Sequence, residues 1–159
     1  MKILLLYYSY GGNTHGVARH IREVLGCDTV EILPVTPYTG SYDLIVNQGQ
    51  QEVSAGFEPP VQPMGKELKD YDTVILGTPV WWYTFAPAVK SVLSSQDWAG
   101  KTIYPFATNG GWIGHTFQDI EKACAGATVK KGLNIRFEED RMRTSIKAVD
   151  HWIAQIKED

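Results

Sequence analysis

A short polar segment near the N-terminus has the residue types of an anion-binding turn. Its sequence is Ser9-Tyr10-Gly11-Gly12-Asn13-Thr14. The side chains of Ser, Asn and Thr can donate hydrogen bonds, and two adjacent glycines let a ligand approach the backbone without meeting a Cβ atom. The turn contains no Lys or Arg, so neutral donors would hold any anion bound there.

The segments on either side predict where this turn lies in a fold. Ile3–Tyr7 is an apolar block of strand length, and Val17, Ile21, Val24 and Leu25 recur at the spacing of an amphipathic helix. A turn from the end of a strand to the start of a helix gathers free backbone N–H groups at the positive end of the helix dipole. That arrangement suits a phosphate, although a plain turn with a Ser or Thr helix cap is the alternative.

Two well-known phosphate motifs do not match this turn. The P-loop pattern requires a lysine that the turn lacks, and the glycines of Gly11–Gly16 do not have the dinucleotide spacing G-x-G-x-x-G. A mononucleotide phosphate remains, and the rest of the chain must support it.

Chain-wide properties limit the function classes. With 159 residues and 43% hydrophobic content, we expect one globular domain over residues 1–159 with a sizeable core. The net charge of −3 argues against nucleic acid as a partner. Cys27 and Cys124 have neither a metal-ligand spacing nor a disulfide framework, so no metal is expected. No stretch has the length of a membrane span, and we expect no membrane partner and a cytoplasmic location.

Strand and helix patterns alternate along the chain. The predicted strands are 2–8, 28–33, 73–77, 102–107 and 133–137, and the predicted helices are 13–25, 41–54, 86–94, 116–125 and 143–157. This alternation predicts an α/β fold, a doubly wound parallel sheet with helices on both faces. In such sheets, ligands bind beyond the carboxyl ends of the strands.

Two predicted loops at that edge are unusually aromatic. After the third strand come Thr78, Pro79, Val80, Trp81, Trp82 and Tyr83, and after the fourth come Thr108, Asn109, Gly110, Gly111 and Trp112. Core packing accounts for Phe85 and one of Trp81 and Trp82. A flat aromatic ligand, stacked by indoles, accounts for the others.

The order of these features resembles the flavodoxin family over the whole chain, in its short form. The resemblance is carried by the Ser-x-x-Gly-Asn-Thr cradle at Ser9–Thr14 and by Pro79-Val80-Trp81-Trp82. It implies a five-stranded sheet of order 2-1-3-4-5 and FMN as the cofactor. The phosphate would lie on Ser9–Thr14, and the isoalloxazine ring would lie between residues 78–83 and 108–112. Trp81 matches the stacking tryptophan of the family, and Trp112 is the candidate for the other side of the ring.

The sequence departs from many flavodoxins in three ways. Gly11 stands where a hydroxyl residue is common, and the segments 9–15, 78–85 and 108–116 contain no carboxylate to lower the flavin potential. Trp82 and Tyr83 follow the stacking position, where flavodoxins commonly have a glycine whose peptide flips toward the half-reduced flavin. Positive φ at such a residue costs about 1 kcal/mol or more relative to glycine.

Two functions follow from the resemblance. The first is an electron carrier between redox partner proteins. The alternative is an FMN-dependent NAD(P)H:quinone or nitro reductase, which transfers two electrons to a small quinone-like substrate. Neither requires a catalytic side chain. Three further classes of protein fit the sequence less well. A receiver domain would need acidic residues where Tyr8 and Ser9 stand, and a tyrosine phosphatase would need a Cys-x5-Arg motif. The third class is a non-catalytic binding module of the same fold that has lost its flavin.

Overall fold

Five strands form a parallel sheet at the centre of the molecule. They are β1 (Ile3–Tyr7), β2 (Asp28–Glu31), β3 (Thr73–Trp81), β5 (Thr102–Asn109) and β7 (Leu133–Glu138). The structure, a computed structural model, describes residues 1–159. The strands lie in the order β2-β1-β3-β5-β7 and every neighbouring pair is parallel. Renumbered as five strands, this is the predicted order 2-1-3-4-5, so the fold class is confirmed.

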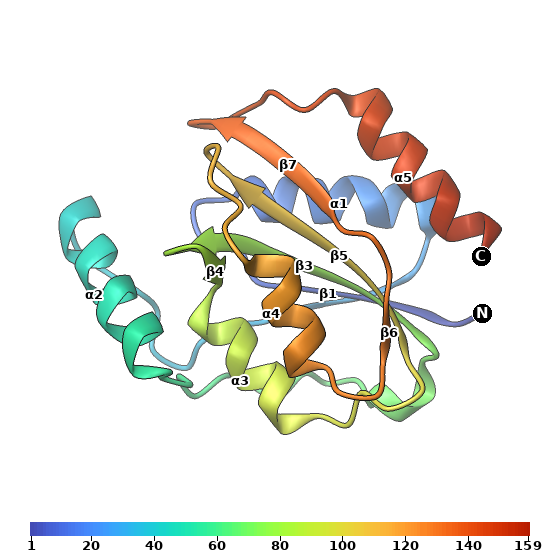
Figure 1. The fold of residues 1–159 in the computed structure, drawn as a ribbon, viewed down its shortest axis with the longest axis horizontal. Coiled ribbons are helices and arrows are strands. Elements are labelled where there is room, and N and C mark those ends of the chain that lie inside the picture. The colour runs from blue at the N-terminus through green and yellow to red at the C-terminus, as the bar shows by residue number, and fades with distance from the viewer.

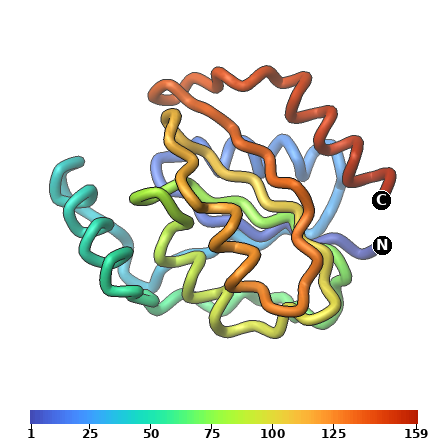
Figure 2. The backbone as a smooth tube through the Cα atoms, viewed as in Figure 1, coloured from blue at the N-terminus to red at the C-terminus, as the bar shows by residue number.

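Helices cover both faces of this sheet, as Figure 1 shows. The helices α1 (Asn13–Leu25) and α5 (Ile146–Glu158) pack on one face, and α3 (Pro87–Ser95) and α4 (Thr116–Ala123) pack on the other. The remaining helix, α2 (Tyr42–Ala55), stands at the side of the molecule beyond the end of β3 (Figure 2). Only two residues of α2, Ile45 and Gly49, are buried, so most of its surface faces solvent.

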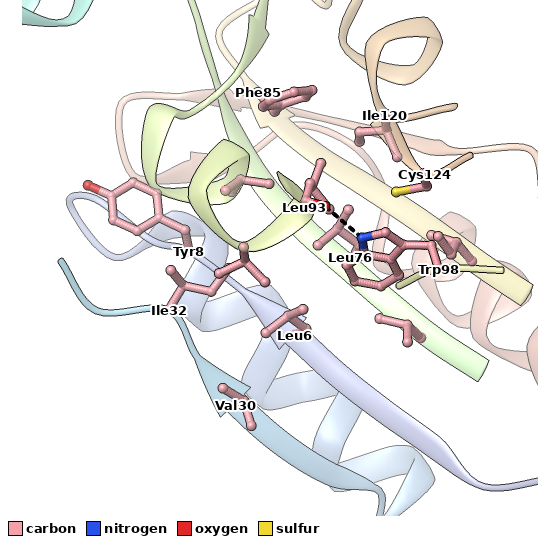
Figure 3. Close-up of a cluster of buried hydrophobic side chains, with 14 of the residues drawn as sticks. Leu6, Tyr8, Val30, Ile32, Leu76, Phe85, Leu93, Trp98, Ile120 and Cys124 are labelled. Carbon is pink, nitrogen blue, oxygen red and sulfur yellow. Dashed lines mark hydrogen bonds between the residues drawn. The ribbon is translucent and has the colours of Figure 1, made fainter. Parts of the chain in front are cut away.

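Alternation along the strands divides the core into two clusters. On β1, Leu4 and Leu6 face the cluster under α3 and α4, whereas Leu5 faces the cluster under α1 and α5. Figure 3 shows part of the first cluster, where the indole N–H of Trp98 donates to the Leu93 carbonyl at 2.9 Å. Burial on both faces explains why the central strands β1, β3 and β5 are largely apolar, whereas the outer strands β2 and β7 carry polar residues as well.

Three short strands were not predicted. They are β4 (Thr84–Phe85), β6 (Thr128–Val129) and β8 (Arg141–Met142). Antiparallel pairing with β4 extends β3 to Trp81, so the prediction that Thr78–Trp81 is loop was wrong. Thr108 and Asn109 likewise belong to β5 rather than to a loop. A 3₁₀ turn at Leu68–Asp70 leads into β3.

None of the helices combines the length and apolar character needed to cross a membrane.

Candidate functional site

The turn between β1 and α1 is built to receive an anion on its backbone. Gly11 and Gly12 have φ values of 81° and 100°, a left-handed conformation that glycine adopts without steric cost. The resulting path leaves six consecutive N–H groups without an acceptor in the protein: those of Ser9, Tyr10, Gly11, Gly12, Asn13 and Thr14. Since the last two open helix α1, they add the positive end of its dipole.

The polar side chains of the turn have structural partners. The hydroxyl oxygens of Thr14 and Thr108 lie 2.8 Å apart, and Asn13 Nδ2 donates to the Glu139 carbonyl at 2.8 Å. The oxygen of Ser9 accepts the His15 N–H at 3.0 Å, which leaves the Ser9 hydroxyl hydrogen free to donate. The expectation that these three side chains add donors stays a prediction, because the Asn13 amide has a second N–H and either hydroxyl of the Thr14–Thr108 pair can be the donor.

His15 stands beside this turn and was not among the sequence candidates. Its Nδ1 lies 2.7 Å from the Tyr7 hydroxyl, which also reaches Glu31 at 3.4 Å. Burial raises the pKa of Tyr7 to about 12, with a further contribution from the nearby Glu31 carboxylate. Tyr7 therefore keeps its proton at neutral pH and holds the histidine ring against the end of β1.

A crevice of about 220 Å³ opens where the carboxyl ends of β3 and β5 meet. It is lined by Val80, Trp82 and Tyr83 from the β3–β4 hairpin, by Asn109 at the end of β5, and by Gly110 and Trp112 from the loop that follows. Trp112 is 74% exposed and Trp82 is 39% exposed, so both indoles present faces to solvent. The structure thus brings together residues from both predicted aromatic segments, more than 25 positions apart in the chain.

The hairpin that carries Trp82 has a strained turn. Val80 pairs with Phe85 and Trp81 with Thr84, so Trp82 and Tyr83 form a two-residue turn, with φ values of 50° and 71°. Glycine or Asn usually occupies such positions, and other residues cost about 1 kcal/mol each.

Three contacts hold this turn in place. The Trp82 indole N–H donates to the Val46 carbonyl at 3.0 Å, and the His115 N–H donates to the Tyr83 carbonyl at 2.8 Å. A Cβ added at Gly114 would come within 2.3 Å of the same carbonyl, so the absence of a side chain there lets the two segments meet. Contacts from α2 and from the loop after β5 thus offset the backbone strain at Trp82 and Tyr83.

Trp81 does not line this crevice. Its ring packs edge-on against Tyr8, Tyr10 and Tyr38, with centroids 6.1, 6.0 and 4.9 Å away. The resemblance to flavodoxins implies Trp81 as the stacking indole opposite Trp112, and this stays a prediction; the residues that line the crevice with Trp112 include Trp82 and not Trp81. Packing on three tyrosines next to the core explains the difference, because those long-range contacts are not visible in the sequence.

The other predicted residues support the crevice from below. Thr78 and Thr108 are 0% and 4% exposed. The Thr78 hydroxyl donates to the Pro79 carbonyl at 2.8 Å and accepts the Ala86 N–H at 3.2 Å. Asn109 shapes the following loop, since its side-chain oxygen accepts the Gly111 N–H at 2.9 Å.

A carboxylate lies just beyond the segment that the sequence described as uncharged. Asp119, in the first turn of α4, accepts a hydrogen bond from Thr84 at 2.6 Å and is bonded to His115 Nδ1. The spacing of four residues between His115 and Asp119 is the signal that could have identified this pair, because such residues are neighbours on a helix.

The comparisons with known proteins agree with this architecture. The family model for flavodoxin matches residues 2–156. Candidate flavoproteins from Bacteroides eggerthii and Bacteroides uniformis are each 28% identical, both with a TM-score of 0.82. The first alignment covers 98% of both chains, and the second covers 96% of this chain and 97% of the other. A Lactobacillus acidophilus flavoprotein in complex with FMN has the same fold, with 20% identity, a TM-score of 0.73, and 95% and 97% coverage.

Proposed function

This chain belongs to the flavodoxin family, and on that premise we propose that it binds FMN and carries electrons between partner proteins. The family and the FMN complex of the Lactobacillus flavoprotein support FMN as the cofactor. We place this activity in the cytoplasm. The observation that carries the proposal is the row of free N–H groups from Tyr10 to Thr14 beside an open aromatic crevice.

The cradle fits the phosphate of FMN. A dianionic phosphate has several acceptor oxygens, and the N–H groups of Tyr10–Thr14 are donors with no protein partner. Hydrogen bonds to charged groups stabilise by about 1.5–3 kcal/mol each. No Lys or Arg is needed, because the helix dipole of α1 supplies part of the positive potential.

The crevice fits a flat ring system. In our proposal, the isoalloxazine lies between Trp82 and Trp112, with the backbone of Gly110 giving close approach. Val80, Tyr83 and Asn109 complete the walls, while Thr78, Pro79, Trp81, Thr108 and Gly111 shape the site from outside the crevice. FMN, when bound, supplies the redox chemistry by taking up and releasing electrons. The residues of the chain bind it, orient it and keep one edge accessible.

Exposure of the crevice favours a carrier. Trp112 and Tyr83 are 74% and 52% exposed, so the ring edge would lie at the surface, where another protein can approach it. No side chain of the crevice is a free acid or base, which fits a protein whose task is to exchange electrons.

The turn at Trp82 and Tyr83, which hydrogen bonds hold in place, favours the second candidate function, the FMN-dependent NAD(P)H:quinone or nitro reductase. Both residues already have positive φ and are held by Val46 and His115. A rigid turn, with no carboxylate in the crevice lining, would give the cofactor little stabilisation of a half-reduced state and would favour paired electrons.

A reductive titration separates the two functions. The holoprotein is reduced with dithionite under argon while absorbance spectra are recorded, and NADPH oxidation is then followed with and without a quinone. Two resolved one-electron steps and no NADPH oxidation support the carrier. One two-electron step with quinone-dependent NADPH oxidation supports the reductase. Failure of the purified protein to bind added FMN would refute both.

A further inference from the structure

We propose that a second pocket, between α2 and the end of β3, binds a flat, uncharged aromatic molecule. This inference goes beyond the proposed function, because the pocket is distinct from the crevice assigned to the flavin ring. The pocket, here called the α2 pocket, has a volume of about 300 Å³. It is lined by Tyr10, Tyr42, Ile45, Val46, Gly49, Val80, Trp81 and Trp82.

The chemistry of the lining selects the ligand. No lining residue is charged, and four of the eight are aromatic, so a charged ligand would lose its hydration without gaining a partner. Indole and phenol rings instead offer stacking and edge contacts to another ring. The hydroxyls of Tyr10 and Tyr42 have no hydrogen-bond partner in the protein, and either could donate to a carbonyl or hydroxyl oxygen on the ligand.

The walls of the α2 pocket are preformed. Trp81 is fixed by its edge contacts with Tyr8 and Tyr38. A Cβ at Gly49 would come 3.1 Å from the Trp81 ring, so glycine allows α2 to lie directly against the indole. The bond from the Trp82 indole N–H to the Val46 carbonyl, 3.0 Å long, ties the opposite wall to the same helix. A pocket that is ordered before binding avoids the entropic cost of forming it.

The α2 pocket adjoins the crevice proposed for the flavin ring. Val80 and Trp82 line both spaces, and Trp82 stands between them. A ligand in the α2 pocket would therefore lie one side chain away from the cofactor ring without displacing it.

Size argues for a small molecule as the occupant. A volume of about 300 Å³ is at the lower end of the range for small-molecule sites and accommodates a molecule of one or two rings. A protein partner needs about 800 Å² of surface on each side. The α2 pocket is a cavity of small-molecule size rather than a surface of that extent.

The test uses 2-naphthol as an uncharged probe and 2-naphthalenesulfonate as its charged counterpart. Both are titrated into the oxidised, FMN-loaded, ¹⁵N-labelled protein, and the Trp82 indole N–H signal is followed by NMR because that group faces Val46. We expect 2-naphthol to shift this signal saturably and the sulfonate to bind at least tenfold more weakly. Equal binding of the two probes, or release of FMN by 2-naphthol, would overturn the proposal.

Matched variants locate the binding site. Val46→Phe fills the α2 pocket, whereas Leu44→Phe adds the same bulk at a neighbouring position that is 63% exposed and outside the lining. We expect V46F to weaken 2-naphthol binding at least tenfold and L44F to leave it unchanged. Tyr42→Ala, at a residue 79% exposed, leaves the core intact and should weaken binding about threefold. Equal affinities in V46F, Y42A and L44F would contradict the proposal.

The outcome for the pocket can be separated from the outcome for FMN. FMN loading is measured first, by the flavin absorbance that remains with the protein after gel filtration. A protein that retains FMN but ignores 2-naphthol refutes the pocket and leaves the proposed function standing. A protein that retains no FMN but binds 2-naphthol in the α2 pocket refutes the proposed function and leaves the pocket standing.

Discussion

The cradle at Tyr10–Thr14 and the hairpin turn at Trp82–Tyr83 both use left-handed backbone, with opposite residue choices. In the cradle, Gly11 and Gly12 have positive φ, and a Cβ on either would meet no atom within 4 Å. In the hairpin turn, a tryptophan and a tyrosine adopt positive φ. The cradle thus avoids strain, whereas the hairpin turn accepts it.

The difference follows from what each segment contributes to the site. In the proposed function, the cradle binds through backbone N–H donors, so side chains are dispensable at the glycines. The hairpin turn would instead contribute an indole face, which requires the side chain of Trp82. Contacts with Val46 and His115 then offset the strain. The predictions below test this contrast in order of expected effect.

The largest effect is expected for Gly114→Ala. The new Cβ would come 2.3 Å from the Tyr83 carbonyl, at a residue with φ of +57°. Steric clash and backbone strain together should lower the free energy of unfolding by about 3 kcal/mol, and FMN affinity should fall at least tenfold. Urea unfolding and FMN titration measure the two effects.

Gly110→Ala is the matched control, because a Cβ there meets no atom within 4 Å and φ is not positive. It should change stability by less than about 0.5 kcal/mol. Equal stability of the G114A and G110A proteins would show that the loop after β5 does not lock the hairpin turn.

The next effect concerns the indoles. Trp82→Ala removes a wall of the crevice and should weaken FMN binding by about 2 kcal/mol, from lost burial and stacking. Trp81→Ala should instead lower stability, because that ring packs on three tyrosines. Fluorescence titration with FMN distinguishes the two. Weaker FMN binding by W81A than by W82A would restore Trp81 as the stacking indole predicted from the sequence.

A smaller effect is expected in the cradle. Gly12→Ala introduces no clash but forces a non-glycine residue to a φ of 100°, which should cost about 1 kcal/mol in FMN affinity and in stability. Gly16→Ala, within α1 and also in open space, should be neutral or stabilise by up to about 1 kcal/mol. If both variants bind FMN like the parent protein, the positive φ at Gly12 is not needed for the cradle.

The smallest effect, absent at neutral pH, concerns Tyr7 beside the cradle. Burial and Glu31 raise its pKa from 10.0 to about 12 in the folded protein. Between these values the unfolded chain releases a proton that the folded chain retains, so Tyr7 makes stability fall as pH rises through this window. Thermal unfolding of Tyr7→Phe should therefore show a shallower decline above pH 10 than the parent. An identical decline would mean that Tyr7 ionises alike in both states.

Local patterns were sufficient to predict the sheet and the cradle. The apolar run of β1, the glycines at Gly11 and Gly12 and the stripe of α1 are all local signals, and each predicts an element that the structure contains. The extension of β3 to Trp81 was missed because it depends on pairing with β4, a two-residue strand that is too short to predict from sequence. Which of Trp81 and Trp82 lines the crevice depends on the packing of Tyr8, Tyr10 and Tyr38 around the Trp81 ring. These tyrosines are far from Trp81 in the sequence, so their spacing does not predict the contact.

The central claim, that backbone N–H groups of the cradle hold the phosphate of FMN, is tested most directly by comparing FMN with riboflavin. The apoprotein is titrated with each at pH 7, following the quenching of flavin fluorescence. Riboflavin has the same ring without the phosphate, so it loses only the cradle contacts. We predict that FMN binds at least about 100-fold more tightly, corresponding to about 2.7 kcal/mol. Equal affinities would contradict the account, because the ring alone would then carry the binding.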